Sequence, residues 1–338
     1  MAHRGQRRAV TAGDSIPARV LIVRLGALGD VTGALACAGA LRRARPDLHV
    51  GWAVHDLALP LVEGHPWVDR VHLWKRGGGI AGLLSFVGEL RAERYDVVLD
   101  LQRILKSALV ARLCGASRTV GYDRARAKEL SWLLHSEHIA PGDRRAPMIL
   151  QALEFAAHLG ATDLTPMREL PREPEAEAWA QALVAELGAA PIAVNVGASK
   201  PPNRWVPERF AQLARTLAEH GHSIVLTGGP EDRDWAAAAC GAADGARIRD
   251  LVGRTSIPQL VSLYRRLSLY VGCDTGPMHV AAACDVRCVA LFGPADPQRT
   301  GPFGPGHVIV RAPERGGSRP MNGIEVDAVL TAVRSAQS

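Results

Sequence analysis

The chain has 338 residues, of which 47% are hydrophobic and 22% charged, with a formal net charge of +6. This length exceeds what one hydrophobic core usually supports, and the composition is typical of a folded protein rather than a disordered or fibrous one. No stretch approaches the roughly 20 consecutive apolar residues that cross a bilayer, and residues 1–17 lack the apolar core of a signal peptide. We therefore expect a cytoplasmic protein with a disordered tail at residues 1–17.

Charge and cysteine content narrow the classes of partner. Residues 18–170 carry +4 of the net charge, whereas residues 171–338 are neutral overall. The basic residues are not interleaved with aromatic side chains and no nucleic-acid-binding motif occurs, so we expect no nucleic acid partner; an acidic substrate or an anionic membrane surface fits this charge. The six cysteines show no CxxC pair or zinc spacing, which indicates reduced thiols and no metal site.

The front half alternates strands and helices. The apolar, β-branched run at residues 19–25 is typical of a strand in a parallel sheet. A glycine-bearing loop follows, and the sequence then predicts a helix to about residue 45 and a strand at 49–54. The alternation continues with strands near 69–74, 95–101 and 117–121 and with helices at 80–94, up to 113, and 146–159. Such βαβ units predict a parallel sheet.

A proline-rich segment at residues 161–174 predicts a linker, after which the same rhythm restarts. The expected helices are 175–187, 207–220, 232–241, 257–266, 276–284 and 323–335, and the expected strands are 191–196, 223–228, 268–272 and 287–292. We therefore predict an α/β protein of two Rossmann-like domains whose parallel sheets face a central cleft. The predicted domains are residues 18–165 and 166–322, followed by a C-terminal helix, 323–338, that could pack back on the first domain.

The loop at residues 26–33, GALGDVTG, is the first candidate site. Its glycines allow a tight turn and the close approach of a ligand. Asp30 would lie at the following helix N-terminus, facing the cleft, where a carboxylate could take a proton from a hydroxyl group. Taken alone, Asp30 fits a helix cap at least as well.

The second candidate is the turn at residues 271–279, VGCDTGPMH, between a buried strand and a helix. Backbone amides around Thr275 and Gly276 would point at an anion in the cleft, which suits a diphosphate. His279 falls one helical turn further on and could add a donor. A threonine cap and an ordinary core histidine are the alternatives.

Three further loops carry polar residues. Residues 195–205 offer Lys200 and Arg204 to neutralise phosphate, and residues 227–234 offer Glu231 to ribose hydroxyls. Acids are expected in the first turn of the helix that begins near Glu231, so we do not interpret the Asp-Arg-Asp triplet there as a metal motif. The turn-rich segment 291–304 is expected to form a wall of the cleft.

In this order the segments resemble glycosyltransferase family 9, the heptosyltransferases that build the inner core of lipopolysaccharide, over residues 18–335. The motifs are RLGALGD (24–30), LQRILKSALVAR (101–112), SKPPNRWVPERF (199–210), TGGPED (227–232), DTGPMH (274–279) and LFGPADPQRTGPFG (291–304). The second motif and the GYDRARAKE that follows it are most similar to heptosyltransferase I, which adds the first heptose to Kdo.

The resemblance implies a GT-B fold and an inverting transfer of heptose from an ADP-sugar to an acidic, lipid-linked acceptor such as Kdo, with no metal or other cofactor. Asp30 matches the catalytic base. The implied donor residues are Lys200, Arg204, Glu231, Asp274, Thr275, Gly276 and His279, and the implied acceptor residues are Gly29, Lys106, Arg124, Arg126 and Lys128. The lipid-linked acceptor leaves peripheral contact with the cytoplasmic face of the inner membrane open.

This chain departs from the family pattern in three places. Asn203-Arg204-Trp205 stands where many members have Lys-x-Trp, so Arg204 or Lys200 would stabilise the leaving group. Arg103 follows Gln102 where a glycine is common, and WKRGGG (74–79) also differs. The last two departures concern the acceptor side, and they leave open the alternative of a family 9 transferase with a different sugar acceptor.

Two other classes of protein compete with this interpretation. Glycines 26, 29 and 33 after a strand, with Asp56 past the next strand, imitate the dinucleotide site of an oxidoreductase. The G-x-G spacing is absent, however, and a second phosphate loop at 274–279 would be redundant. A basic protein that binds anionic lipid or nucleic acid through its front half would leave the polar loops of the second half unexplained.

Overall fold

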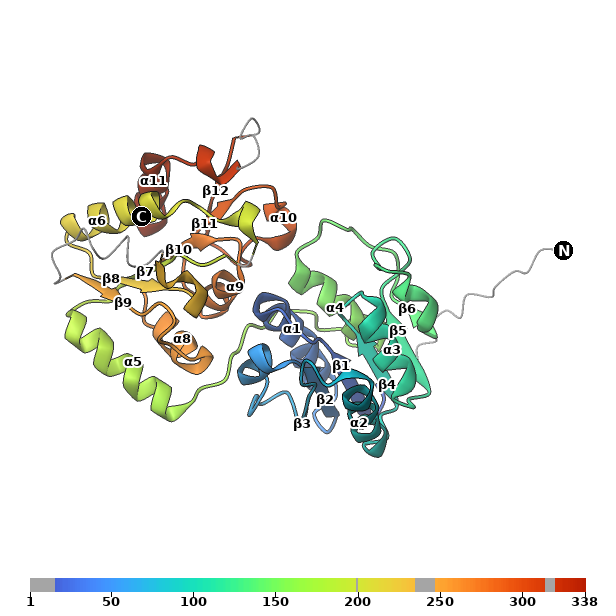
Figure 1. Ribbon diagram of the computed structural model, residues 1–338. Coiled ribbons are helices and arrows are strands. Elements are labelled where there is room, and N and C mark those ends of the chain that lie inside the picture. The colour runs from blue at the N-terminus through green and yellow to red at the C-terminus, as the bar shows by residue number, and fades with distance from the viewer. Residues whose placement is uncertain (1–15, 199, 235–246, 314–319) are drawn as a thin grey trace.

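The computed structural model describes residues 16–198, 200–234, 247–313 and 320–338. It contains two six-stranded parallel sheets, with strand orders β3-β2-β1-β4-β5-β6 and β12-β11-β10-β7-β8-β9. Figure 1 shows them in two lobes, the first built from the front of the chain and the second from the back. The predicted α/β architecture with two Rossmann-like halves is confirmed.

The first lobe alternates strands and helices along the chain. Its strands are β1 (Arg19–Val23), β2 (His49–Val54), β3 (Arg70–Leu73), β4 (Val97–Asp100), β5 (Arg118–Gly121) and β6 (Glu137–His138). Its α-helices are α1 (Leu28–Ala44), α2 (Gly79–Ala92), α3 (Leu105–Leu113) and α4 (Met148–His158), and the short 3-10 helices are η1 (Asp56–Leu61) and η2 (Ser131–Leu134). Because β1 pairs in parallel with both β2 and β4, the strand order reverses beside β1, where α/β proteins usually bind ligands.

The second lobe repeats this plan. Its strands are β7 (Ile192–Asn195), β8 (Ile224–Thr227), β9 (Ile248–Asp250), β10 (Leu269–Cys273), β11 (Cys288–Phe292) and β12 (Val308–Arg311). The helices are α5 (Pro174–Leu187), α6 (Pro207–Glu219), α8 (Ile257–Tyr264), α9 (Gly276–Ala283), α10 (Pro297–Thr300) and α11 (Val326–Gln337), with η3 (Pro201–Asn203), η4 (Pro230–Asp232) and η5 (Pro320–Gly323). Residues 161–173, where the linker is predicted, form no helix or strand.

The predicted elements differ from the observed ones mainly at the sheet edges. Strands β6, β9 and β12 were not predicted, because they are two to four residues long, lie at or near sheet edges and contain no fully buried apolar run. The predicted helix 232–241 lies mostly outside the described residues, as does the predicted tail apart from Ile16 and Pro17.

The C-terminal helix α11 packs on the second lobe. It contacts α6 and strands β10, β11 and β12, and its Val329 and Val333 are buried in the core cluster of that sheet. The expectation that this helix packs back on the first domain is therefore wrong. The apolar side chains at positions 326, 329, 330 and 333 form one helical face, and the sheet next to it in the chain already covers that face.

The two lobes meet where α1 and α9 cross. The core cluster that contains Leu28 continues into Met278 of α9, so apolar packing is continuous between the lobes. The helices approach closely because each presents a glycine: a Cβ atom on Gly29 would lie 2.3 Å from the His279 ring, and one on Gly276 would lie 2.8 Å from Leu28 Cβ. This contact brings the first turns of the two helices together.

Replacing Gly29 by Ala should therefore force α1 and α9 apart. We expect a loss of about 1–3 kcal/mol of stability, the usual cost of overpacking, together with a large loss of activity. Differential scanning calorimetry and a turnover assay would measure the two effects. Gly88→Ala is the matched control, because Gly88 lies in α2 with no atom within 4 Å of an added Cβ, and it should stabilise the protein. Unchanged stability in Gly29→Ala would contradict the close helix contact.

Candidate functional site

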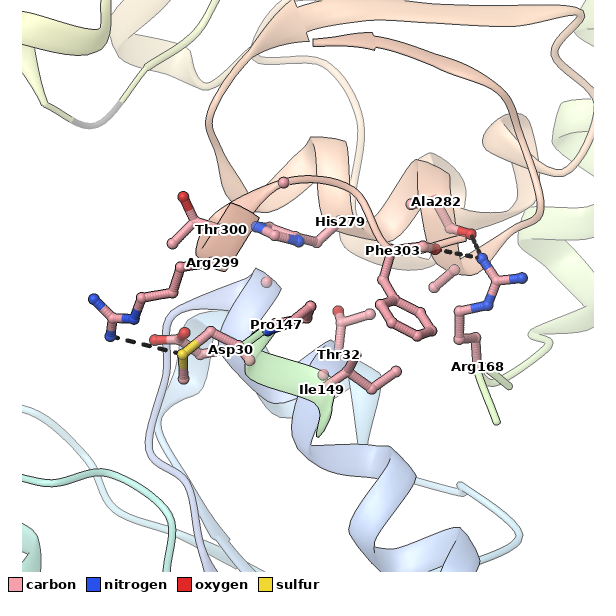
Figure 2. Close-up of a pocket in the computed structure, with 15 residues that line it drawn as sticks. Asp30, Thr32, Pro147, Ile149, Arg168, His279, Ala282, Arg299, Thr300 and Phe303 are labelled. Carbon is pink, nitrogen blue, oxygen red and sulfur yellow. Dashed lines mark hydrogen bonds between the residues drawn. The ribbon is translucent and has the colours of Figure 1, made fainter. Parts of the chain in front are cut away.

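A pocket lies at the junction of the two lobes, beside the α1–α9 contact. Its lining comes from the start of α1, the start of α4, Arg168, the later part of α9, the end of α10 and the loop that follows α10. Figure 2 shows Asp30 and Pro147 on one side and His279, Arg299 and Thr300 on the other. Residues 299–301 and Phe303 form part of this lining, as predicted for the 291–304 segment. Both lobes therefore contribute side chains to the pocket.

Asp30 occupies the first turn of α1 and lines this pocket. Its carboxylate forms an ion pair with Arg24, which also donates a hydrogen bond to the carbonyl of Leu101. Arg24 is buried, whereas 38% of the Asp30 side chain is exposed. The arginine thus fixes the carboxylate from behind and leaves it accessible to a ligand in the pocket. No side-chain cap hydrogen bond forms at the start of α1, so Asp30 is not the helix cap that the sequence left open.

The Asp274–Gly276 turn faces Asp30 across the α1–α9 contact. Thr275 is the N-cap residue of α9, and its hydroxyl donates to the Cys273 carbonyl (3.2 Å) instead of capping the helix. The Thr300 hydroxyl donates to Asp274 Oδ2 at 3.3 Å. Burial raises the pKa of Asp274 to about 6; the charge of Asp30 acts in the same direction, while Thr300 and Lys200 oppose it.

His279 lies one turn into α9, against the backbone of Gly29. Burial lowers the pKa of its imidazole, and the charge of Asp30 opposes that shift. The ring is therefore neutral at physiological pH, so it can donate one hydrogen bond or accept one.

The other predicted donor residues lie on loops of the second lobe. Lys200 is exposed, and its charge reaches Asp274. Arg204 has a different setting: its guanidinium pairs with Asp232 (2.6 Å) and donates to the Ala198 carbonyl (2.8 Å). Asp232 is buried and also accepts from the backbone amide of Gly229 (2.9 Å). Arg204 and Asp232 thus hold the two loops together.

Glu231 lies at the surface beside Gly229, since a Cβ on that glycine would be 2.4 Å from a Glu231 carboxylate oxygen. Glycine at position 229 therefore leaves room for the Glu231 carboxylate to fold over the backbone. The carboxylate remains accessible to a hydroxyl-bearing ligand.

Three of the basic residues predicted for the acceptor are exposed on the first lobe. The Lys106 ammonium lies 4.0 Å from the centre of the Trp74 ring, and the Arg124 guanidinium lies 5.2 Å from that of Trp132. Lys128 is also exposed. Aromatic rings hold such cations in place without neutralising them, so these charges stay available to an anion.

Arg126 does not fit the acceptor role predicted for it. Its side chain is fully buried and forms ion pairs with Asp123 (2.5 Å) and Glu154 (2.6 Å), and it donates to the Ala140 carbonyl (2.7 Å). These partners raise the pKa of the guanidinium against the opposing effect of burial. Two carboxylates therefore neutralise the charge, and Arg126 stabilises the loop instead of contacting a ligand.

Three arginines in or next to the pocket lining were not among the predicted site residues: Arg24, Arg103 and Arg299. Arg299 lines the pocket, and Arg24 holds Asp30. Arg103 appeared only as a departure from the family pattern. Arg24 directly follows β1, at the carboxyl edge of the sheet where α/β proteins bind ligands, and only this position in the sequence could have indicated it.

This architecture defines a class of protein: two Rossmann-like lobes with a shared pocket form the GT-B arrangement of nucleotide-sugar-dependent glycosyltransferases. The chain belongs to glycosyltransferase family 9 (heptosyltransferase), whose sequence model matches residues 83–321. It is therefore a glycosyltransferase.

Comparison with individual proteins gives the same result. The chain is 28% identical over 310 residues to lipopolysaccharide heptosyltransferase 1 of Escherichia coli K12, covering 87% of this chain and 94% of the relative. A family 9 glycosyltransferase structure from Veillonella parvula superimposes with a TM-score of 0.84 at 22% identity, over 96% and 98% of the two chains. The E. coli heptosyltransferase WaaC with ADP-2-deoxy-2-fluoro heptose gives a TM-score of 0.73 at 25% identity, over 94% and 99%.

Replacing Asp274 by Asn should change how stability depends on pH. The wild-type pKa is raised in the folded state, so Asp274 favours folding when protonated, and this contribution is lost as pH rises from about 4 through about 6. Relative to wild type, Asp274→Asn should therefore gain melting temperature between pH 5 and pH 7.5. Asp327→Asn, an exposed residue in the first turn of α11, should show no such gain. If the melting temperatures of wild type and Asp274→Asn differed by the same amount at every pH, the raised pKa of Asp274 would be contradicted.

Proposed function

We propose that this glycosyltransferase moves heptose from an ADP-heptose donor to an acidic, lipid-linked sugar such as Kdo of the lipopolysaccharide inner core, with inversion at the anomeric carbon. The observation that carries the proposal is that Asp30 on α1 faces the first turn of α9, where the Gly29–His279 and Leu28–Gly276 contacts join the lobes. The similarity to heptosyltransferase 1 and to WaaC with its ADP-sugar supports the donor and the acceptor class.

The reaction is a single displacement. The acceptor hydroxyl loses its proton to Asp30 as its oxygen attacks the anomeric carbon, and the bond from that carbon to the diphosphate oxygen breaks. Arg24 orients the carboxylate from behind, since the two form an ion pair. The first lobe, residues 18–165, holds the acceptor. Of its proposed acceptor residues, Gly29 lines the pocket, and Lys106, Arg124 and Lys128 are exposed on the same lobe.

The departing diphosphate leaves toward the second lobe, residues 166–322. The free backbone amides at the start of α9 favour an anion at that helix end, and neutral His279 and the exposed Lys200 add donors. Glu231 suits the ribose hydroxyls of ADP. Arg204 acts indirectly, because its pairing with Asp232 positions the loop that carries Lys200.

We propose that transfer needs no metal ion. In the described ranges no group of three or more His, Cys, Asp or Glu side chains could hold one.

No helix in the parts of the chain that the structure describes is long and apolar enough to cross a membrane. Contact with a lipid-linked acceptor would therefore be made at a membrane surface by the exposed basic residues of the first lobe.

The test of this function is product formation with a panel of ADP-, GDP- and UDP-sugars and Kdo-lipid A. Wild type should give one heptosylated product, only with ADP-heptose, and Asp30→Asn should lower kcat roughly 100- to 10,000-fold because the proton acceptor is lost. ADP affinity, measured by calorimetry, should be unchanged in this variant. Asp327→Asn serves as the control for loss of a carboxylate. Substantial turnover by Asp30→Asn would remove Asp30 as the base.

Replacing Lys200 by Met should weaken stabilisation of the leaving diphosphate. We expect kcat to fall roughly tenfold or more while the KM for the acceptor stays the same.

Excess EDTA, which removes divalent metal ions, should leave the wild-type rate unchanged. Loss of activity in EDTA that Mg²⁺ restores would contradict the metal-free mechanism.

A further inference from the structure

Three arginine side chains converge beside Asp30, two from the first lobe and one from the second. Arg103 and Arg299 each direct an Nη2 atom at the sulfur of Met148, at 3.5 and 3.7 Å. The two guanidinium groups are therefore within about 7 Å of each other across the junction of the lobes; Figure 2 shows the Arg299 contact as a dashed line. Arg24 joins them through its ion pair with Asp30. We call Arg24, Arg103 and Arg299 the arginine cluster.

The charges of the arginine cluster exceed those of its partners. Asp30 pairs with Arg24, and among the described residues no carboxylate pairs with Arg103 or Arg299. The Nε atoms of all three are buried with no hydrogen-bond partner among the described residues. Arg24 and Arg103 are only 4% and 7% exposed, so water contacts their side chains little. Such a group is costly unless an anion completes it.

Electrostatics agrees with this count. Burial lowers the pKa of Arg299, and repulsion from Arg103 and Arg24 lowers it further, while Asp30 and Tyr122 oppose the shift. Arg126 lies nearby but does not contribute an open charge, because Asp123 and Glu154 neutralise it. The excess positive charge therefore belongs to the cluster itself.

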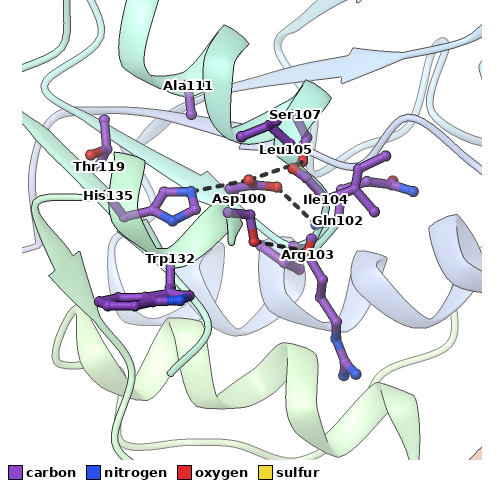
Figure 3. A network of polar contacts seen from close by, with 12 residues as sticks. Asp100, Gln102, Arg103, Ile104, Leu105, Ser107, Ala111, Thr119, Trp132 and His135 are labelled. Carbon is purple, nitrogen blue, oxygen red and sulfur yellow. Dashed lines mark hydrogen bonds and ion pairs between the residues drawn. The ribbon is translucent and has the colours of Figure 1, made fainter. Parts of the chain in front are cut away.

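Arg103 is held in this position by the loop after β4. Figure 3 shows the buried Asp100 accepting from Ser107 and from the backbone amide of Gln102, with His135 on the same carboxylate. The Arg103 carbonyl accepts from Ser131 Oγ (2.8 Å) and from the amide of Lys128 (2.9 Å).

The backbone of Arg103 lies at φ 74°, a region that favours glycine. In Figure 3 its side chain extends away from the Asp100 network. The guanidinium carbon of Arg103 lies 4.1 Å from the centre of the Tyr122 ring. The chain thus keeps an arginine where a glycine would be less strained, and strain of this kind is usually retained at functional sites.

We propose that the arginine cluster binds the carboxylate of the acceptor sugar and so positions the attacking hydroxyl at Asp30. This inference rests on the proposed transfer to an acidic acceptor. Guanidinium groups bind carboxylates through paired hydrogen bonds, and the cluster adjoins the proposed base. Since Arg24 and Arg103 belong to the first lobe and Arg299 to the second, a bound carboxylate would also offset their repulsion and hold the two lobes together.

The test compares two probes, the methyl glycoside of Kdo and its carboxamide, which has nearly the same shape without the charge. Binding to the full chain is measured by calorimetry with ADP present, so that the readout does not require transfer. Wild type should bind the acid roughly ten- to a hundredfold more tightly than the carboxamide. Arg103→Gly and Arg299→Leu should each lose most of this preference while ADP affinity stays the same.

Arg103→Gly is expected to fold, because glycine adopts φ 74° without strain. Arg94→Gly is the matched control: Arg94 is exposed and also has a positive φ, 51°, but lies in the turn after α2 and is not part of the arginine cluster, so this variant should keep the full preference for the acid.

Two results would overturn the proposal: equal binding of both probes by wild type, or a fall in ADP affinity in the two variants with the acid preference retained. The second result would assign the cluster to the donor diphosphate. Product formation by wild type tests the proposed function separately. Lack of transfer to Kdo-lipid A, together with an acid preference that the variants lose, would contradict the proposed acceptor while supporting the carboxylate site.

Discussion

The close contact between the first turns of α1 and α9 is the constraint on which the pocket depends. At Gly29 and Gly276 the facing atoms occupy the space that a Cβ would need, so the two helices approach more closely than side chains would allow. This approach joins the apolar cores of the lobes and sets Asp30 opposite the Asp274 turn. Side chains from the two lobes thus lie close together, and Asp30 influences the pKa of both Asp274 and His279.

The arginines around this contact differ in whether carboxylates balance their charge. Arg204 and Arg126 are both engaged by buried or partly buried carboxylates, and both stabilise loops. Arg103 and Arg299 have no such partner among the described residues, although they are close to each other. Burial alone does not show the role of an arginine. Carboxylate partners that balance its charge indicate a structural role, and their absence among the described residues is the basis for proposing a bound anion.

The sequence predicted most of the fold because buried parallel strands and amphipathic helices have strong periodic signals. It predicted poorly the short edge strands β6 and β12 and the partner of α11, since these depend on neighbours far away in the chain. Of the candidate site, Asp30 and the 274–279 turn follow from their places between a strand and a helix. The acceptor role that the resemblance implies for Arg126 does not fit its ion pairs, which the sequence does not reveal because its partner Glu154 lies 28 positions away.

The sequence by itself determined the two-lobed α/β architecture and the family, because ordered motifs and hydrophobic periodicity are local properties of the chain. It also determined which loops follow the carboxyl ends of the strands. Only the tertiary structure decided which of the many arginines are neutralised and which converge on the pocket. The physical reason is that ion pairs form between residues distant in sequence, and Arg24, Arg103 and Arg299 come together only when the lobes meet.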